Sequence, residues 1–252
     1  MQRRWTVIIL ALLVMLVDTA WAKSCSIQEV AEQVYGRAHK VDLELSACKV
    51  WPAKPGITLA VMALNARRAK NPEDGGQEDL EVLMVDSTSY QILARRYEAN
   101  RLDYEEVRTG ALILDTAPYR LNSDTLAFGL RISRYSDSRV EILYESGLSI
   151  YIPEGERLVA VLDDLKVDSY TGERSERCAG DYSKINATVS LGESTSHGFC
   201  SLVINNTIYT YTTEQRSMSD CKTVREQTSH KRDTLIFDGS RYQVPEKLTV
   251  LH

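Results

Sequence analysis

The sequence predicts a mostly β protein that is exported, disulfide-stapled and opened by one short helix. Three observations carry this prediction. An export signal begins the chain, five cysteines follow it, and short apolar or alternating runs separated by polar turn clusters fill most of the remaining length. Such spacing is typical of an antiparallel β-sandwich or of propeller-like sheets, and the pattern alone does not choose between them.

The first 22 residues have the pattern of a cleavable signal peptide. Arg3 and Arg4 precede a wholly apolar run over residues 7–17, and Ala20-Trp21-Ala22 supplies small residues before the cleavage point. The apolar run is about half of the roughly 20 residues that a membrane-spanning helix needs. We therefore expect a periplasmic or secreted mature chain with no integral membrane segment.

The charge of the chain bears on its partners. Asp and Glu number 35 against 30 Lys and Arg, which gives a formal net charge of −5. An acidic chain without a long basic run argues against nucleic acid and against an anionic membrane surface as partners.

The cysteines of an exported chain are first interpreted as disulfides. Cys25 and Cys48 flank a compact N-terminal unit, so local pairing favours a bond between them. Cys178 and Cys221 lie in polar, loop-like surroundings, whereas Cys200 lies in an apolar strand pattern. We predict a second bond between Cys178 and Cys221, with Cys200 left as a free, inert thiol. The sequence has no C-x-x-C pair that would indicate a metal site.

The mature chain opens with a predicted helix and a strand. Ser26 and Glu29 fit a capping box, apolar residues then recur on one helical face, and Gly36 offers a stop. Alternation over residues 41–45 predicts a strand that runs toward Cys48. The first disulfide would tie this helix to this strand.

Strand patterns fill the rest of the chain. In the first part they cover residues 57–64, 80–85, 91–97, 111–114, 126–132, 148–152 and 158–162. A polar, turn-prone composition over residues 169–181 places a boundary between a domain at 23–168 and a C-terminal β-rich subdomain at 169–252. Further strands are predicted at 187–191, 199–204, 207–213, 234–237 and 242–244. Thr and Tyr dominate residues 207–213, which favours a pleated, partly exposed sheet.

No motif assigns a catalytic residue. The four histidines lie far apart, and the sequence contains no nucleophile elbow, P-loop, dinucleotide fingerprint or zinc-protease helix. The acidic pairs Asp163-Asp164 and Glu105-Glu106 suggest the paired carboxylates of glycosidases. Neighbours on a strand point to opposite faces, however, so neither pair is expected to act as a unit.

One loop is a candidate calcium site. It resembles in part the calcium loop of FG-GAP propeller repeats, with Asn71, Glu73, Gly76, Asp79 and Leu80 at matching positions. It departs from that pattern at Gly75, where an acid is wanted, and at Asn71, which replaces the first Asp. The candidate ligands are Asn71, Glu73, Asp74 and Asp79. The alternative is a solvated hairpin loop that binds no metal.

Three further segments carry a broader resemblance. They are Cys48-Lys49-Val50-Trp51-Pro52, the hairpin from Met84-Val85-Asp86 to Ile92-Leu93-Ala94-Arg95, and the ending Thr234-Leu235-Ile236-Phe237-Asp238-Gly239-Ser240-Arg241-Tyr242. With the export signal, they resemble uncharacterised exported proteins of Gram-negative bacteria. The resemblance implies a periplasmic or secreted location and a β-rich fold, and it carries no activity.

These observations favour a non-enzymatic envelope protein that binds a protein or an envelope component through a β-rich surface. Tyr supplies 13 of the aromatic residues against 3 Trp and 3 Phe, and this composition allows a tyrosine-rich binding face. One alternative is a hydrolase of envelope carbohydrate or ester that uses loop carboxylates such as Asp163 and Asp164. Another is a calcium-stabilised binding module.

Overall fold

The computed structural model describes residues 25–36, 41–68, 76–176, 178–217 and 220–250. Within these ranges the chain forms two short helical segments and eleven strands. In order they are α1 (Ile27–Tyr35), β1 (Val41–Val50), β2 (Ile57–Arg68), β3 (Gly76–Asp86), β4 (Ile92–Asp103), β5 (Val107–Arg120), β6 (Leu126–Ser136), β7 (Glu141–Glu154), β8 (Arg157–Glu176), β9 (Ala179–Ser196), β10 (Phe199–Ser217), β11 (Asp220–Leu235) and the 3-10 turn η1 (Glu246–Leu248). The mostly β class and the N-terminal helix are confirmed.

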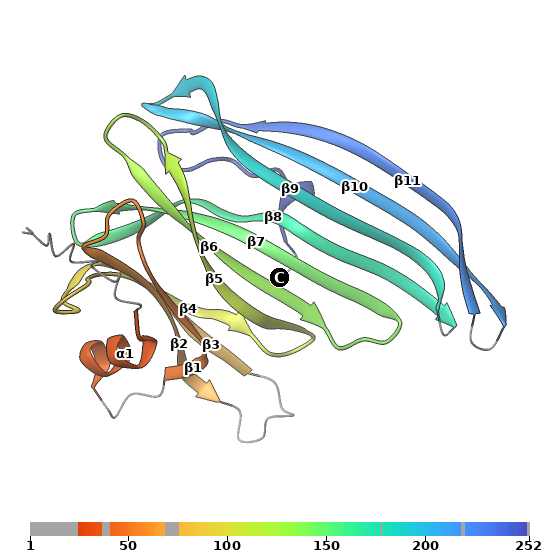
Figure 1. Cartoon of the computed structure of the whole chain (residues 1–252), viewed down its shortest axis with the longest axis horizontal. Helices are drawn as coiled ribbons and strands as arrows, with labels where there is room; N and C mark the ends of the chain where they lie inside the picture. The colour runs from red at the N-terminus through yellow and green to blue at the C-terminus, as the bar shows by residue number, and fades with distance from the viewer. Residues whose placement is uncertain (1–24, 37–40, 69–75, 177, 218–219, 251–252) are drawn as a thin grey trace, which may run out of the picture.

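The eleven described strands belong to one hydrogen-bonded sheet. Its main path runs β1-β2-β3-β4-β8-β7-β6-β5, and β9, β10 and β11 extend from β8 in that order (Figure 1). Pairing is antiparallel except between β4 and β8, which are parallel and meet at Arg95 and Arg157. The expected sandwich and propeller-like arrangements are therefore not confirmed, because this connectivity gives a single, branched, mixed sheet.

The sheet branches along β8. This strand pairs with β7 over most of its length, and from Asp168, opposite Asn186, it also pairs with β9. The expected boundary between residues 168 and 169 falls inside β8, at this branch. The polar segment that follows, expected to be turn-prone, is strand up to Glu176 because Tyr and Thr suit a pleated sheet.

The largest apolar cluster lies inside the curl of the sheet, where β1 comes close to β5. Trp51 meets Phe128 edge to face at 5.6 Å between ring centroids, and Phe128 stacks on Tyr151 at 5.8 Å. These three buried rings join the β1–β2 turn to β6 and β7. Aromatic pairs of this kind add to the free energy that burial of their area contributes.

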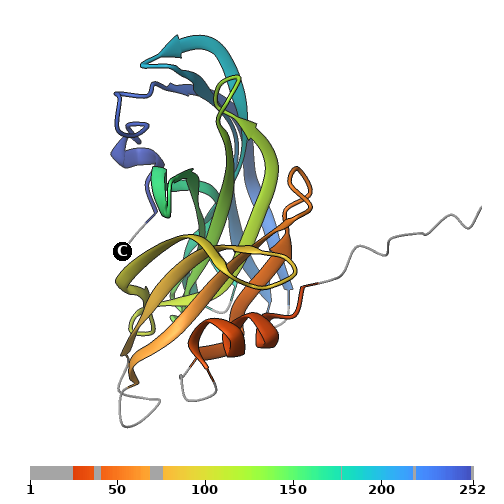
Figure 2. The same cartoon turned by 90° about the vertical axis from the view of Figure 1, so that its left-hand side faces the viewer.

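Two further clusters cover other parts of the sheet. The C-terminal segment brings Phe237, Tyr242 and Leu248 against buried residues of β7, β8 and β10, and Figure 2 shows this segment on one side of the curved sheet. The expected strand at 242–244 is reduced to a bridge between Phe237 and Tyr242. Helix α1 packs Val30 and Ala31 against β2 and β3.

Two disulfides tie the ends of these elements. Cys25–Cys48 joins the start of α1 to β1, and Cys178–Cys221 joins the start of β9 to the start of β11. Both pairs match the expected ones, and Cys200 is a free, partly buried thiol whose pKa is raised by burial. Two disulfides indicate an oxidising compartment.

The predicted signal peptide, residues 1–22, lies outside the described residues. Among the residues that are described, no helix has both the length and the apolar character needed to cross a membrane.

Candidate binding site

The arm formed by β7, β8, β9 and β10 carries tyrosines in register on one face. Tyr144 lies opposite Tyr170, Tyr170 opposite Lys184, and Lys184 opposite Tyr209. In the neighbouring row, Tyr182 lies opposite Tyr211. Residues that are opposite each other, or two apart on a strand, share a face of the sheet. With Tyr135, which lies opposite Tyr144, these residues define the tyrosine face: Tyr135, Tyr144, Tyr170, Tyr182, Tyr209 and Tyr211.

Four of these rings form a continuous stack. Ring centroids are 6.1 Å apart for Tyr170–Tyr182, 4.8 Å for Tyr182–Tyr211 and 5.4 Å for Tyr209–Tyr211, with interplanar angles of 7°, 15° and 28°. Tyr182 lies at the centre and is buried. Offset stacking at these separations is favourable, and it restricts each ring to one orientation. The face is therefore pre-ordered.

Gly172 makes room for the central ring. A Cβ built on Gly172, directly opposite Tyr182, would lie 2.4 Å from Tyr182 Cδ1. No side chain fits at that distance, so the ring can lie against the backbone of β8 only when position 172 is glycine. The sequence pattern of an isolated glycine in a strand is typical of such a close approach.

Hydrogen bonds fix the phenol groups. The hydroxyls of Tyr170 and Tyr211 are 2.9 Å apart, Tyr209 Oη donates to Glu226 at 2.8 Å, and Tyr182 Oη donates to the Cys178 carbonyl at 3.2 Å. Burial, followed by the bond to Tyr211, raises the pKa of Tyr170 to about 12. Tyr170 is therefore neutral at physiological pH, and the exposed Lys184 lies between it and Tyr209 on the same face.

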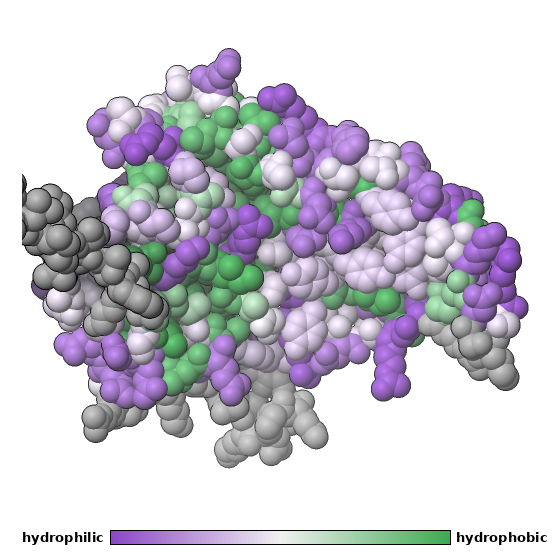
Figure 3. Space-filling view, viewed as in Figure 1, coloured by the Kyte–Doolittle hydropathy of each residue, from purple (hydrophilic) through white to green (hydrophobic). Residues whose placement is uncertain are grey.

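Part of the tyrosine face is open to a partner. Tyr135 and Tyr144 are 39% and 38% exposed, and the rings of Tyr170, Tyr209 and Tyr211 are partly exposed. Figure 3 shows pale aromatic rings gathered over the part of the molecule that β7–β10 occupy in Figure 1. The sequence drew attention to tyrosine as a residue type, but the register was needed to bring these six together.

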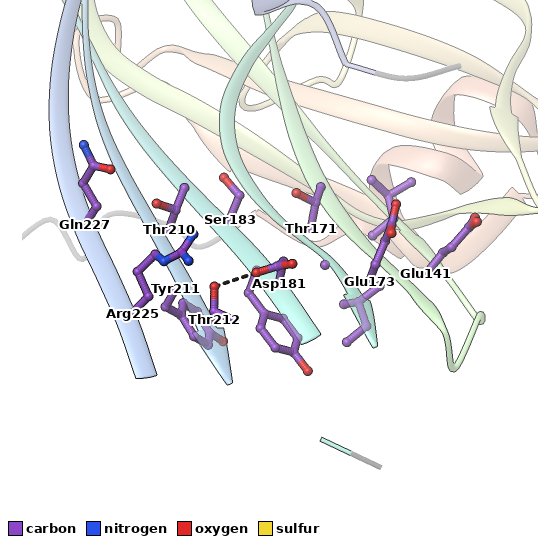
Figure 4. Close-up of a pocket in the computed structure, with 14 residues that line it drawn as sticks. Glu141, Thr171, Glu173, Asp181, Ser183, Thr210, Tyr211, Thr212, Arg225 and Gln227 are labelled. Atoms are coloured by element: carbon purple, nitrogen blue, oxygen red, sulfur yellow. Dashed lines mark hydrogen bonds between the residues drawn. The ribbon is translucent and has the colours of Figure 1, made fainter. Parts of the chain in front are cut away.

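The opposite face of the same strands carries two rows of mainly polar residues. Glu141, Glu173, Asp181, Thr212 and Arg225 stand in one row across β7–β11. The next row contains Leu143, Thr171, Ser183, Thr210 and Gln227. Both rows contribute to the lining of a pocket of about 800 Å³, to which Tyr182 and Tyr211 also contribute (Figure 4). Thr212 Oγ1 donates to Asp181 Oδ1 at 2.6 Å. These rows alternate with the tyrosines along each strand, so they point away from the tyrosine face.

The candidate acids Asp163 and Asp164 lie elsewhere, in β8 before the point at which this strand begins to pair with β9. Arg101 Nη2 is 2.8 Å from Asp163 Oδ1 and 2.8 Å from Asp164 Oδ2, and Arg134 Nη2 is 3.1 Å from Asp164 Oδ2. The expectation that these neighbours point to opposite faces is wrong. The register shifts here, between the pairs of Leu148 and Ile150, and Asp164 has φ +47°, so both carboxylates reach one arginine.

The second acidic pair lies at a different opening. Glu105 and Glu106 are exposed between β4 and β5, and they line a pocket of about 540 Å³ with Arg101 and Arg134. The same two arginines contact Asp164. The arrangement is an ion-pair cluster beside a polar pocket.

The calcium candidate is only partly described. Asn71, Glu73 and Asp74 lie outside the described residues, and Asp79 is buried in β3, where its carboxylate accepts hydrogen bonds from Tyr97 Oη and from the Asn100 amide at 2.8 Å. In the part of the chain that the structure describes, no group of three or more His, Cys, Asp or Glu residues is arranged to hold a metal.

We predict that calcium leaves the unfolding temperature unchanged, because Asp79 already has protein partners on both oxygens. Thermal unfolding in calcium and in chelator measures this. A ligand that binds the native state at 100 times its Kd stabilises it by about 2.7 kcal/mol, so a calcium-dependent rise in unfolding temperature would contradict the prediction.

Comparisons with known proteins give no family for this chain. No family model, no curated protein and no solved structure matches it.

Proposed function

We propose that this chain is an exported envelope protein that binds a protein or another envelope component through the tyrosine face. The observation that carries the proposal is the gathering of six tyrosines on one face of β6–β10, with four of the rings in a continuous stack. Export and the bacterial envelope rest on the signal pattern and on the resemblance drawn from the sequence. The two disulfides support an oxidising compartment.

Tyrosine suits such a surface for a physical reason. Its ring gives a large contact area with only two side-chain torsions to restrict, and its hydroxyl hydrogen-bonds to polar groups at the rim. Here the stack and the hydroxyl bonds hold the rings before any partner arrives. Binding then costs less conformational entropy than it would on a mobile surface.

We expect Tyr135→Thr/Tyr144→Thr to lose binding. Both rings are more than one third exposed, and Thr keeps the strand propensity, so the variant should keep the native sheet, which circular dichroism checks. The oxidised mature chain is immobilised, and species captured from a Gram-negative envelope extract are quantified. The double variant should retain less than about one tenth of the species that the native chain captures, which corresponds to about 1.4 kcal/mol.

The matched control changes the other face of the same arm. Ser183→Ala/Thr210→Ala alters the polar rows and leaves every tyrosine in place. This variant should capture the same species as the native chain. Loss of capture from the polar-face variant, with capture by the tyrosine-face variant intact, would overturn the proposal.

A further inference from the structure

The sheet ends at a long, uncovered edge strand. β11 pairs with β10 alone among the described strands, and Figure 1 shows it along the outer edge of the arm. Its 16 residues are exposed except at Cys221, Ser229, Asp233 and Leu235, which are partly or fully buried. An edge strand presents a row of backbone donors and acceptors that a further strand can use.

The charges along this edge alternate in a self-complementary way. Arg225 and Glu226 lie near its middle, and Arg232 and Asp233 follow at the far end. Arg225 lies opposite Thr212 and therefore points to the polar side of the sheet, and Asp233, an even number of residues away, points to the same side. Glu226 lies opposite Tyr211 and therefore points to the side of the tyrosine face, as does Arg232. Glu226 accepts a hydrogen bond from Tyr209, and Asp233 Oδ1 contacts Lys247 at 2.6 Å.

We propose that β11 pairs antiparallel with β11 of a second copy of this chain, centred on Ser229. A two-fold axis perpendicular to the sheet keeps each face on its own side, so only registers centred on a residue are possible. Centring on Ser229 places Arg225 opposite Asp233 of the second copy and Glu226 opposite Arg232. By symmetry each contact occurs twice, which gives opposite charges on both faces.

Neighbouring registers do not place opposite charges against each other on both faces of the sheet. Centring on Thr228 places Arg225 opposite Lys231, and centring on Gln227 places Lys222 opposite Arg232. Centring on Glu226 or on Lys231 places that residue opposite its own copy. Centring on His230 brings no pair of opposite charges together. Among the registers centred between Glu226 and Lys231, charge complementarity therefore favours the one centred on Ser229, which alone pairs opposite charges on both faces.

The dimer has a consequence for the tyrosine face. A two-fold axis perpendicular to the sheet leaves both tyrosine faces on the same side, so the two copies form one wider aromatic surface. The dimer itself rests only on the edge of β11 and does not require the proposed binding function.

The test is the oligomeric state of the oxidised mature chain by sedimentation equilibrium over a wide range of concentration. The native chain should dimerise, and Arg232→Glu, which places two like-charged pairs in the interface, should weaken the dimer about tenfold or more. Glu226→Arg/Arg232→Glu restores opposite charges and should restore the dimer. Lys222→Glu reverses a charge on the same strand outside the paired segment and should have no effect.

Circular dichroism checks that each variant keeps the native sheet. A native chain that stays monomeric overturns the proposal. So does a folded Arg232→Glu variant that dimerises as the native chain does, or a folded double variant that stays as weak as the single one. Equal weakening by Lys222→Glu would also overturn it, because the register would then not be the one centred on Ser229.

Discussion

Replacing Asp164 with alanine is expected to lower the free energy of unfolding by about 3–5 kcal/mol, the usual cost of breaking a buried ion pair. Asp164 is 2% exposed, and its carboxylate contacts the guanidinium groups of Arg101 and Arg134. Without it, Arg134 keeps its charge at a position that is 5% exposed. Chemical denaturation measures the loss as a lower midpoint with an unchanged slope.

The neighbouring acid provides the matched control. The Asp163 side chain is 53% exposed, although it contacts the same Arg101. Asp163→Ala should therefore cost less than Asp164→Ala, about 1–2 kcal/mol, because it breaks an exposed ion pair and removes the acceptor of the buried Ser149 hydroxyl. Equal losses for the two variants would contradict the assignment of Asp164 as the buried centre of the cluster.

Gly172→Ala is expected to disrupt the tyrosine face. The new Cβ would lie 2.4 Å from Tyr182 Cδ1 and 3.0 Å from the Asp181 carbonyl oxygen, so the ring must leave its place between Tyr170 and Tyr211. Overpacking of this kind costs about 1–3 kcal/mol of stability. Capture from the envelope extract should fall, as we also expect for the double tyrosine variant. Near-ultraviolet circular dichroism reports the change in tyrosine environment.

Gly56→Ala is the control for this substitution. No atom lies within 4 Å of a Cβ built on Gly56, so its stability should change by less than about 0.5 kcal/mol. Its tyrosine spectrum and its capture of partners should match those of the native chain. If Gly172→Ala behaves in the same way, the close packing of Tyr182 on β8 is wrong.

Local signals predicted the elements that have local causes. The helix was predicted from its cap and period, and α1 begins after Ser26, whose Oγ accepts from the Glu29 amide. β2, β3 and β6 were predicted because their buried stretches are apolar. Most of β11 was not predicted, since an edge strand exposed on both faces has no apolar alternation to reveal it.

The candidate site depends on which strands pair and in which register, and a single sequence does not reveal either. Tyrosine abundance suggested a binding face, but placing Tyr144 beside Tyr170 and Tyr182 beside Tyr211 needs the register of four strands. The error at Asp163 and Asp164 has a similar origin. Alternation along a strand holds only where no bulge interrupts it, and the irregularity beside Leu165 follows from how β8 meets β7.

The most direct test of the tyrosine face is tyrosine labelling with and without envelope extract. The oxidised chain is iodinated under limiting conditions, and modification of each tyrosine is measured by peptide mass spectrometry. Tyr97, which is 55% exposed on β4, serves as an internal reference outside the face. We predict that the extract protects Tyr135 and Tyr144 from iodination and leaves the labelling of Tyr97 unchanged. Equal labelling of Tyr135 and Tyr144 with and without extract, or equal protection of Tyr97, would contradict this prediction.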